Sequence, residues 1–499
     1  MTTFETFLHA LTPLNLALAV GGVVAGTIVG ALPGLTATMA VAVLTPLTFT
    51  MAPDSAMIGL GAIYTGAIYG GCYSAILVNT PGTPSAIATT FDGFPMAKRG
   101  DGDLALTLAN LSSVCGGLVG ALGLLLLAPP LAEVALAFGP VEYFWLAVLG
   151  LTLVAGLSRG SLLKGLIGCC IGLLVSMVGT AVVGGDARYT FGTPLLLGGI
   201  NIVVALIGLF CIPVLIDLAC TPDEHLKMSD EVRGYRLREA LHLAWSRKVN
   251  LLRSSVIGTL IGILPAAGGA IASLIAYGEA RRASPEPGSF GKGAPDGIIA
   301  SESANNATVG GGFIPTLTLG IPGTPADAII LGALLVQGVR TGPNLFSEQS
   351  SIVYTFMFGL ILATLLMLPI GLVLGRYAYK SIIAVPKTVL ASAIALLTIV
   401  GTYAIHNSIG EVWLMFGLGL LGWVLNRADV PPAPIVLGVV LGPIAEQGFV
   451  QAWLIGNATG NLAGMFFGRP ISLAIIAAAL LVLVYPAVRR RLLRRRAAR

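Results

Sequence analysis

The sequence carries little charge. Only 10% of its 499 residues are Asp, Glu, Lys or Arg, whereas soluble globular proteins carry roughly 25%. Hydrophobic residues make up 56% of the chain, and its mean hydropathy is +0.90. So few charged side chains could not cover the surface of a water-soluble fold of this size. The composition therefore excludes a soluble multidomain protein and predicts a polytopic membrane protein.

The motifs of common enzyme classes are also missing. The four histidines have no H-E-x-x-H spacing, and no G-x-S-x-G occurs. The stretch Gly288–Gly293 resembles a phosphate-binding loop, but Glu286 stands where its first glycine is required. Gly293 stands where Ser or Thr would bind Mg²⁺. We therefore expect neither an ATPase nor another enzyme, and no bound cofactor or metal other than a transported ion.

Cysteine and net charge indicate neither redox chemistry nor a nucleic-acid partner. The six cysteines lie in or beside apolar runs without C-x-x-C spacing, and we interpret them as small buried hydrophobic residues. Much of the net charge of +5 belongs to one arginine-rich tail, residues 489–499, directly after an apolar run. Such a cluster predicts a cytoplasmic end next to a membrane span.

Long apolar runs follow one another along the chain. A bilayer core of about 30 Å requires a helix of about 20 apolar residues. The runs that reach or approach this length are 12–32, 36–50, 56–79, 104–128, 141–157, 162–184, 195–219, 250–264, 266–277, 297–320, 349–375, 388–405, 410–425, 432–466 and 470–487. We expect helices in all of them, which predicts an all-α polytopic membrane protein. The segments 79–92 and 320–338 follow runs without a charged break and are expected to form broken, re-entrant helices.

An internal repeat organises these runs. Gly70–Ser85 and Gly311–Ala326 each begin with a glycine pair and contain a Pro-Gly-Thr-Pro box, at one constant offset. Upstream, Gly30–Pro33 matches Gly262–Pro265 at an offset nine residues shorter. Matches in the same order at nearly constant offset predict a duplicated chain.

A polar stretch separates the two copies. We predict a first transmembrane repeat (1–220), a polar cytoplasmic linker (221–249), a second transmembrane repeat (250–488) and the basic cytoplasmic tail (489–499). Lys and Arg near residues 98–99, 159–164 and 221–253 place these loops in the cytoplasm and the N-terminus outside. An odd number of spans then precedes the linker, so the repeats are expected to be inverted, as in many secondary transporters. A cytoplasmic tail further requires 432–466 to count as one span.

The Pro-Gly-Thr-Pro boxes are candidate binding sites. Proline removes a backbone donor and glycine frees φ, so a helix is expected to break at each box. Broken backbone within a membrane borders protein or a wet cavity, and the N-terminus of a half-helix favours an anion. One box would indicate a helix kink, but two at equivalent positions favour a substrate site. The predicted substrate-binding residues are Asn79, Thr80, Pro81, Gly82, Thr83, Pro84, Ser85, Thr318, Pro322, Gly323, Thr324 and Pro325.

A second candidate site opens the run into the second box. Glu302, Asn305 and Asn306 lie one helical turn apart and can share a face. Polar residues in membrane spans are costly unless paired or functional, and carboxylate and amide oxygens are ligands of hard cations such as Na⁺. With Asp327, beside the second box, they are candidates for binding a coupling ion, Na⁺ or H⁺. The alternative is an N-capped helix whose acid lies at the membrane interface.

Several stretches together carry a family resemblance. They are Gly30–Thr36, Tyr69–Gly71 with Ala75–Gly82, Asp92–Met96, Gly139–Tyr143, Glu302–Asn306, Leu319–Gly323, Leu441–Pro443 with Glu446, and Arg469–Ile471. In this combination the chain resembles the large membrane subunit of the tripartite tricarboxylate transporters, over about residues 12–487.

The resemblance implies a multi-pass protein of the bacterial inner membrane. It implies as partners a small membrane subunit and a periplasmic solute-binding protein, and as cargo a small carboxylate, either a di- or a tricarboxylate. Import would be driven by a Na⁺ or H⁺ gradient rather than by ATP. Two alternatives stay open, a passive anion channel and a stand-alone carboxylate symporter that needs no binding protein.

Overall fold

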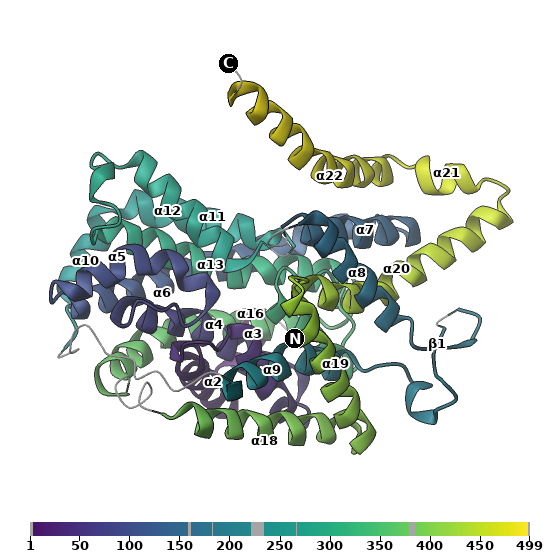
Figure 1. Ribbon diagram of the computed structural model, residues 1–499, viewed down its shortest axis with the longest axis horizontal. Helices are drawn as coiled ribbons and strands as arrows, with labels where there is room; N and C mark the ends of the chain where they lie inside the picture. Colours follow the sequence, from purple (N-terminus) through teal and green to yellow (C-terminus); the bar gives the residue numbers. More distant parts are fainter. Residues whose placement is uncertain are drawn as a thin grey trace. The chain divides into compact units, whose positions relative to one another are not determined.

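The computed structural model describes residues 3–157, 161–181, 183–220, 234–265, 267–378 and 385–497, and it is mostly helical (Figure 1). The helices before the central polar stretch are α1 (Thr3–Ala10), α2 (Pro13–Ala31), α3 (Ala37–Leu44), η1 (Thr45–Thr48), α4 (Pro53–Leu77), η2 (Pro84–Ala86), α5 (Ile87–Lys98), α6 (Gly102–Ala135), α7 (Pro140–Leu157), α8 (Leu162–Ser176), η3 (Pro194–Leu196) and α9 (Ile202–Cys220). Two short strands, β1 (Gly179–Thr180) and β2 (Ala187–Arg188), pair antiparallel.

The helices after the central polar stretch complete the fold. They are α10 (Leu237–Ser246), α11 (Lys248–Ile263), α12 (Gly268–Ala283), η4 (Pro287–Ser289), α13 (Pro295–Leu319), α14 (Pro325–Val336), α15 (Leu345–Glu348), α16 (Ser350–Val373), the π-helix η5 (Leu374–Ala378), α18 (Lys387–His406), α19 (Ile409–Arg427), α20 (Pro432–Ala458), α21 (Leu462–Phe467) and α22 (Pro470–Ala497).

Within the described residues, eight helices are long and apolar enough to cross a membrane. They are α2, α4, α6, α9, α16, α18, α19 and α20. The prediction of an all-α polytopic membrane protein is confirmed. The helix predicted over 195–219 begins only at Ile202, after η3, and the helix predicted over 162–184 was wrong beyond Ser176, where the chain enters the β1–β2 hairpin. Gly179, Gly184 and Gly185 adopt positive φ there, which a continuous helix cannot contain.

The predicted linker and tail both include helix. Residues 221–233 lie outside the described residues, but α10 forms within the rest of the linker. Arg236, just before α10, pairs with Asp101 at 2.8 Å and with Glu239 at 2.6 Å. The tail continues α22 as far as Ala497. The division of the chain into two successive repeats stays a prediction.

Contacts group the chain into two compact units, each built from both halves of the sequence. The first unit is Met1–Ala132 with Phe210–Ser408, and the second is Glu133–Leu209 with Ile409–Arg499. Both Pro-Gly-Thr-Pro boxes and all candidate ion ligands belong to the first unit.

The first unit contains a repeated pair of closely packed helices. α2 packs along α4, and α11 packs along α13. A methyl group on Gly26 would overlap the carbonyl oxygen of Ile63, and one on Gly258 would overlap that of Ala304. Gly26 corresponds to Gly258, and Ile63 to Ala304, by the two offsets of the sequence repeat. Equivalent residues make equivalent contacts, which supports a duplication, while the inverted orientation stays a prediction.

The two copies also border one another within the first unit. α12, from the second copy, packs against η2 and α5, which follow the first box. α3, from the first copy, packs against α14, which follows the second box. The Ser273 hydroxyl of α12 donates to the backbone oxygen of Ser85 at 2.9 Å. Each box is therefore bordered by a helix of the other copy.

Two carboxylates connect distant elements of the second unit. Glu142 of α7 is fully buried and accepts hydrogen bonds at 2.8 Å from Arg469 and from Ser472, at the start of α22. Arg188 of β2 donates to both carboxylate oxygens of Glu446 on α20, at 2.7 and 3.0 Å. These hydrogen bonds raise the pKa of Arg188. Glu142 and Glu446, which both belong to stretches that carry the family resemblance, thus have structural partners.

Candidate functional site

The first box interrupts the chain between α4 and α5, as predicted. α4 ends at Leu77, and Asn79 adopts a left-handed conformation with φ of 57°. The backbone N–H of Gly82 donates to the carbonyl oxygen of Gly71 at 3.3 Å, so the loop folds back against α4. The Thr83 and Ser85 hydroxyls share a hydrogen bond of 2.9 Å. The chain then resumes as η2 and α5.

The second box interrupts the chain between α13 and α14 with a matching backbone. Gly320, the repeat equivalent of Asn79, is also left-handed, with φ of 69°. Thr324 caps α14, because its hydroxyl oxygen accepts from the backbone N–H of Asp327 at 3.2 Å. The same hydroxyl donates to the Asp327 carboxylate at 2.8 Å. At both breaks a left-handed residue therefore follows the end of one helix, and the next helix begins at the proline of a Thr-Pro pair.

The predicted substrate residues differ in exposure and in partners. Buried residues of the set are Gly82, Thr83, Ser85, Thr318, Pro322, Gly323 and Thr324. Thr80, Pro81 and Pro325 are half-buried, whereas Asn79 and Pro84 are exposed. The Thr318 hydroxyl donates to the carbonyl oxygen of Ile314 at 2.7 Å within its own helix. The hydroxyl oxygen can still accept a hydrogen bond, and the role of Thr318 at the break stays a prediction.

The start of α12 lies against both breaks. A Cβ built on Gly268 would lie 3.8 Å from Cγ2 of Thr324, and one on Gly269 would lie 3.0 Å from Cβ of Ser85. The Gly269 Cβ would also overlap the side-chain oxygen of Asn305. Residues from the two boxes and one candidate ion ligand thus gather around one helix N-terminus, whose N-cap, Ala267, makes no side-chain capping bond.

One residue at this site was not predicted. The phenol of Tyr64, on α4, lies 2.9 Å from the Thr324 hydroxyl and is fully buried. Tyr64 is the repeat equivalent of Asn305. Tyr64 therefore extends from α4, before the first box, toward the second box. Asn305 extends from α13, before the second box, toward the first. The sequence contained a signal for Tyr64, because it lies at the position of the repeat that matches the polar candidate Asn305.

Glu302 lies in a second polar cluster. Its carboxylate is fully buried and accepts hydrogen bonds from the hydroxyls of Thr89 on α5 and, at 2.9 Å, of Ser113 on α6. Thr89 also shares a hydrogen bond of 3.0 Å with Ser301. Among the described residues, no Lys, Arg or His forms an ion pair with Glu302. The described hydrogen-bond donors to this buried carboxylate are thus two hydroxyl groups.

The other candidate ion ligands contain buried polar atoms without partners in the described structure. These are both polar atoms of the Asn305 side chain, Oδ1 of Asn306 and Oδ1 of Asp327. All three residues are fully buried. A buried polar atom without a hydrogen bond costs about 1–3 kcal/mol, so such atoms indicate places where a ligand or ion can bind. Amide and carboxylate oxygens fit a hard cation, and an amide N–H fits an anion.

A family model described as the tripartite tricarboxylate transporter TctA family matches residues 16–437. The chain belongs to this family. The resemblance found in the sequence is thereby confirmed, and TctA membership supports the large membrane subunit of such a transporter as its role.

Two relatives of this TctA-family chain come from Agrobacterium vitis. An uncharacterized 52.8 kDa protein in the TAR-I ttuC' 3' region is 37% identical over 492 residues, covering 97% of this chain and 96% of the relative. An uncharacterized protein in the TAR-II ttuC' 3' region is 35% identical over 229 residues, covering 46% of this chain and 92% of the relative. No solved structure matches the chain.

Asp92 of this TctA-family chain has a structural role. Its Oδ1 accepts from the backbone N–H groups of Gly291, Gly293 and Ala294 at 2.8–2.9 Å. Its Oδ2 accepts from the Tyr277 hydroxyl at 2.8 Å. α5 is thereby bound to the loop that precedes α13. The Asp92–Met96 stretch carries part of the family resemblance, but the sequence assigned it no role. In the structure it connects the two copies.

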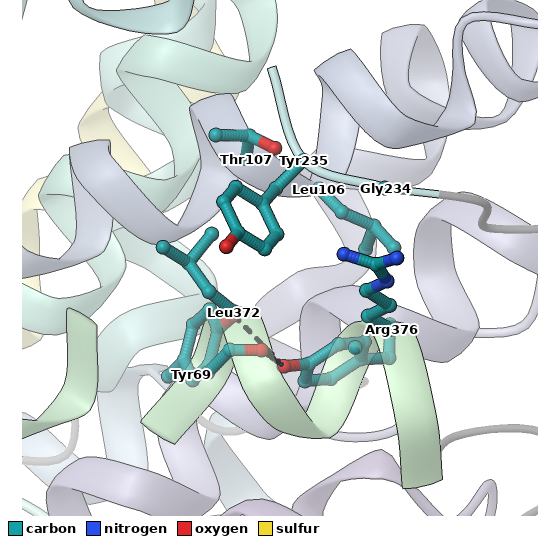
Figure 2. A pocket seen from close by; sticks show the side chains of 10 residues that line it. Tyr69, Leu106, Thr107, Gly234, Tyr235, Leu372 and Arg376 are labelled. Atoms are coloured by element: carbon teal, nitrogen blue, oxygen red, sulfur yellow. Dashed lines mark hydrogen bonds between the residues drawn. The ribbon is translucent and has the colours of Figure 1, made fainter. Parts of the chain in front are cut away.

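A small pocket lies beside α4 and η5 (Figure 2). Its volume is about 10 Å³, room for roughly one water molecule and too little for a tricarboxylate. The Tyr69 hydroxyl donates to Tyr73 at 3.0 Å, and the Tyr73 hydroxyl to the Gly371 carbonyl at 2.5 Å. The Arg376 guanidinium lies 5.9 Å from the ring centre of Tyr235. None of these residues was a predicted site residue.

Proposed function

We propose that this TctA-family chain is the large membrane subunit of a binding-protein-dependent secondary transporter that imports di- or tricarboxylates. One observation carries the proposal. Two helix breaks at repeat-equivalent boxes converge on the start of α12, where hydroxyls, backbone N–H groups and an unpartnered amide lie together. Such groups bind carboxylates without a buried cationic side chain.

The substrate would bind beside the two breaks. Thr83, Ser85 and Thr324 offer hydroxyls, and Gly82 and Gly323 allow the chain to approach closely. A Cβ on Gly323 would lie 2.7 Å from the carbonyl oxygen of Gly262, so any side chain there would displace the loop. The remaining box residues, Asn79, Thr80, Pro81, Pro84, Pro322 and Pro325, would set the loop conformation.

A Na⁺ or H⁺ gradient would drive the import. Glu302 could accept a proton or, with Thr89 and Ser113, offer oxygen ligands to Na⁺. Asn305, Asn306 and Asp327 are further candidates, because each has a buried oxygen without a partner. Oxygen ligands of this kind suit Na⁺, and a buried acid without an ion pair suits H⁺.

The chain would function in the bacterial inner membrane with two partners. A periplasmic solute-binding protein would deliver the carboxylate, and a small membrane subunit would complete the transporter. Family membership supports both partners. The eight apolar helices support a multi-pass location, with the basic tail in the cytoplasm.

Reconstituted transport tests the proposal. Proteoliposomes containing the chain and its small membrane subunit would be given labelled citrate, with and without the binding protein and with an imposed Na⁺ or H⁺ gradient. We expect uptake that requires both the binding protein and one of the gradients. Gradient-driven uptake without the binding protein would identify a stand-alone symporter, and gradient-independent flux would identify a channel.

A double variant tests the two boxes. Thr83→Val with Thr324→Val removes both box hydroxyls at nearly constant volume, so we expect uptake to be lost at normal membrane expression. Thr152→Val is the matched control, because within the described residues the Thr152 hydroxyl on α7 donates to the Val148 carbonyl of its own helix. Uptake by the double variant at the rate of the control would reject the boxes as the substrate site.

A further inference from the structure

The two breaks share a backbone but differ in charge. At the second break, the Asp327 carboxylate lies in the first turn of α14 and bonds to Thr324. The equivalent residue at the first break is Ala86, which has no charge. A carboxylate in the first turn of a helix already satisfies the partial positive charge of that N-terminus. In its ionised form, Asp327 therefore gives the second break a negative charge supplied by the protein itself.

The first break has polar groups that can bind an anion and that the second break lacks. Asn305 is fully buried, and both polar atoms of its amide are unpartnered beside Gly269. Its equivalent, Tyr64, instead forms a hydrogen bond with Thr324. α12 is a helix of 16 residues without a side-chain cap, so its first backbone N–H groups are available to a ligand near Ser85.

We propose that a substrate carboxylate binds at the first break only, between Asn305, Ser85 and the start of α12, and that Asp327 closes the second break to anions. This inference rests on the proposed function and divides its paired site into unlike halves. The Ser85 hydroxyl and the α12 backbone N–H groups donate to the carboxylate, and the Asn305 amide joins them when a flip of the amide turns its N–H group, in place of Oδ1, toward Gly269. At the second break, Coulomb repulsion by Asp327 disfavours a second anion and favours a cation.

Three substitutions test the anion site by different routes. Asn305→Ala removes the amide. Gly269→Ala places a methyl group where it displaces that amide, and it is compatible with helix because the equivalent residue, Ala37, begins α3. Ala86→Asp gives the first break the acid of the second. The glycine that Asp327 packs against, Gly312, has its equivalent in Gly71 beside Ala86, so the acid has a comparable position.

The readout is uptake of labelled citrate by proteoliposomes containing the full chain and its small subunit, with the binding protein and the driving gradient present. We expect each variant to raise the half-saturating citrate concentration at least about tenfold, the effect of losing hydrogen bonds to a charged ligand. Asn110→Ala is the matched control. Asn110 is an equally buried asparagine with an unpartnered oxygen, and it lies on α6 outside the site. Size-exclusion chromatography would establish that each variant folds, and any folded one of the three suffices for the test.

Each outcome has a separate meaning. A raised half-saturating citrate concentration for uptake by a folded variant, with the control unchanged, supports the first break as the anion site. Wild-type half-saturation in every variant that folds overturns the inference and leaves the proposed function in place. Failure of the wild-type chain to take up any di- or tricarboxylate in the presence of the binding protein and the gradient overturns the proposed function itself.

Discussion

At the scale of single residues, the least expected group is the carboxylate of Glu302. It is fully buried, and its described partners are the hydroxyls of Thr89 and Ser113, from two other helices. A buried carboxylate loses its hydration, and two hydroxyl donors offset only part of that loss. Binding of a proton or of Na⁺ would neutralise the charge. Glu302 is therefore suited to change its charge state during transport.

The hydroxyls around Glu302 offer a matched pair of substitutions. Ser113 donates to Glu302 at 2.9 Å, whereas its neighbour Ser112 is equally buried but has an unpartnered hydroxyl. We expect Ser113→Ala to lower the initial rate of gradient-driven citrate uptake by roughly tenfold, the effect of one hydrogen bond to a charged group. Ser112→Ala should retain the wild-type rate. Equal rates in the two variants would mean that the Ser113 hydroxyl does not support uptake.

At the scale of elements, close helix packing determines how the breaks are placed. α2 meets α4, and α11 meets α13, at glycines that leave no room for a side chain. Small residues at such contacts let backbones approach closely, as is common between membrane helices. Because each helix pair leads directly into a break, a shift in the pair would move the loop that follows it.

Two glycines of α2 test this packing. Gly26→Ala would press a methyl group against the Ile63 carbonyl, and we expect a loss of about 1–3 kcal/mol of stability from overpacking. Gly21→Ala lies in the same helix with nothing within 4 Å, so it should be neutral or slightly stabilising. Thermal unfolding of the purified protein in detergent measures both. An unchanged midpoint for Gly26→Ala would contradict the close packing of α2 and α4.

The connection from Asp92 to the loop before α13 gives a prediction of its own. Asp92→Ala removes an acceptor of four hydrogen bonds and should cost about 3 kcal/mol or more. The freed loop should be cut faster by trypsin after Lys292. Asp101→Ala breaks only a half-exposed ion pair with Arg236 and should leave cleavage near the wild-type rate. Equal cleavage of the two variants would show that Asp92 does not secure the loop.

The elements also show what the sequence could and could not predict. Both breaks were predictable because proline and glycine act locally, and the left-handed Asn79 and Gly320 follow from the same preference. The partners of Glu302 were not, because Ser113 and Thr89 are 189 and 213 residues away in the sequence. Contacts between distant helices depend on tertiary packing, for which hydrophobic periodicity has no signal.

At the scale of the whole molecule, the prediction with the widest consequence is the inverted orientation of the two copies. Equivalent glycine contacts in the two helix pairs support the duplication, but they are the same for parallel and inverted copies. Only the distribution of Lys and Arg distinguishes the two arrangements. It places the loop before α4 outside and the corresponding loop before α13 in the cytoplasm.

Cysteine labelling of these two loops tests the inversion. In a background without the six native cysteines, Ala52→Cys should react with a membrane-impermeant maleimide in intact cells. Ser284→Cys, in the corresponding loop, should react only after permeabilisation. Reaction of both cysteines in permeabilised cells is the control for accessibility. Labelling of both from the same side would mean that the copies are parallel.

The crossing of α12 and α3 between the copies has a consequence for the history of the chain. A half-length ancestor would have lacked the helix that borders its own break, so two identical subunits would have had to exchange helices in a homodimer. Gene fusion would then have made those intersubunit contacts intramolecular. It would also have freed matched positions, such as Ala86 and Asp327, to evolve apart. The chemical difference between the breaks would thus be younger than the architecture that contains them.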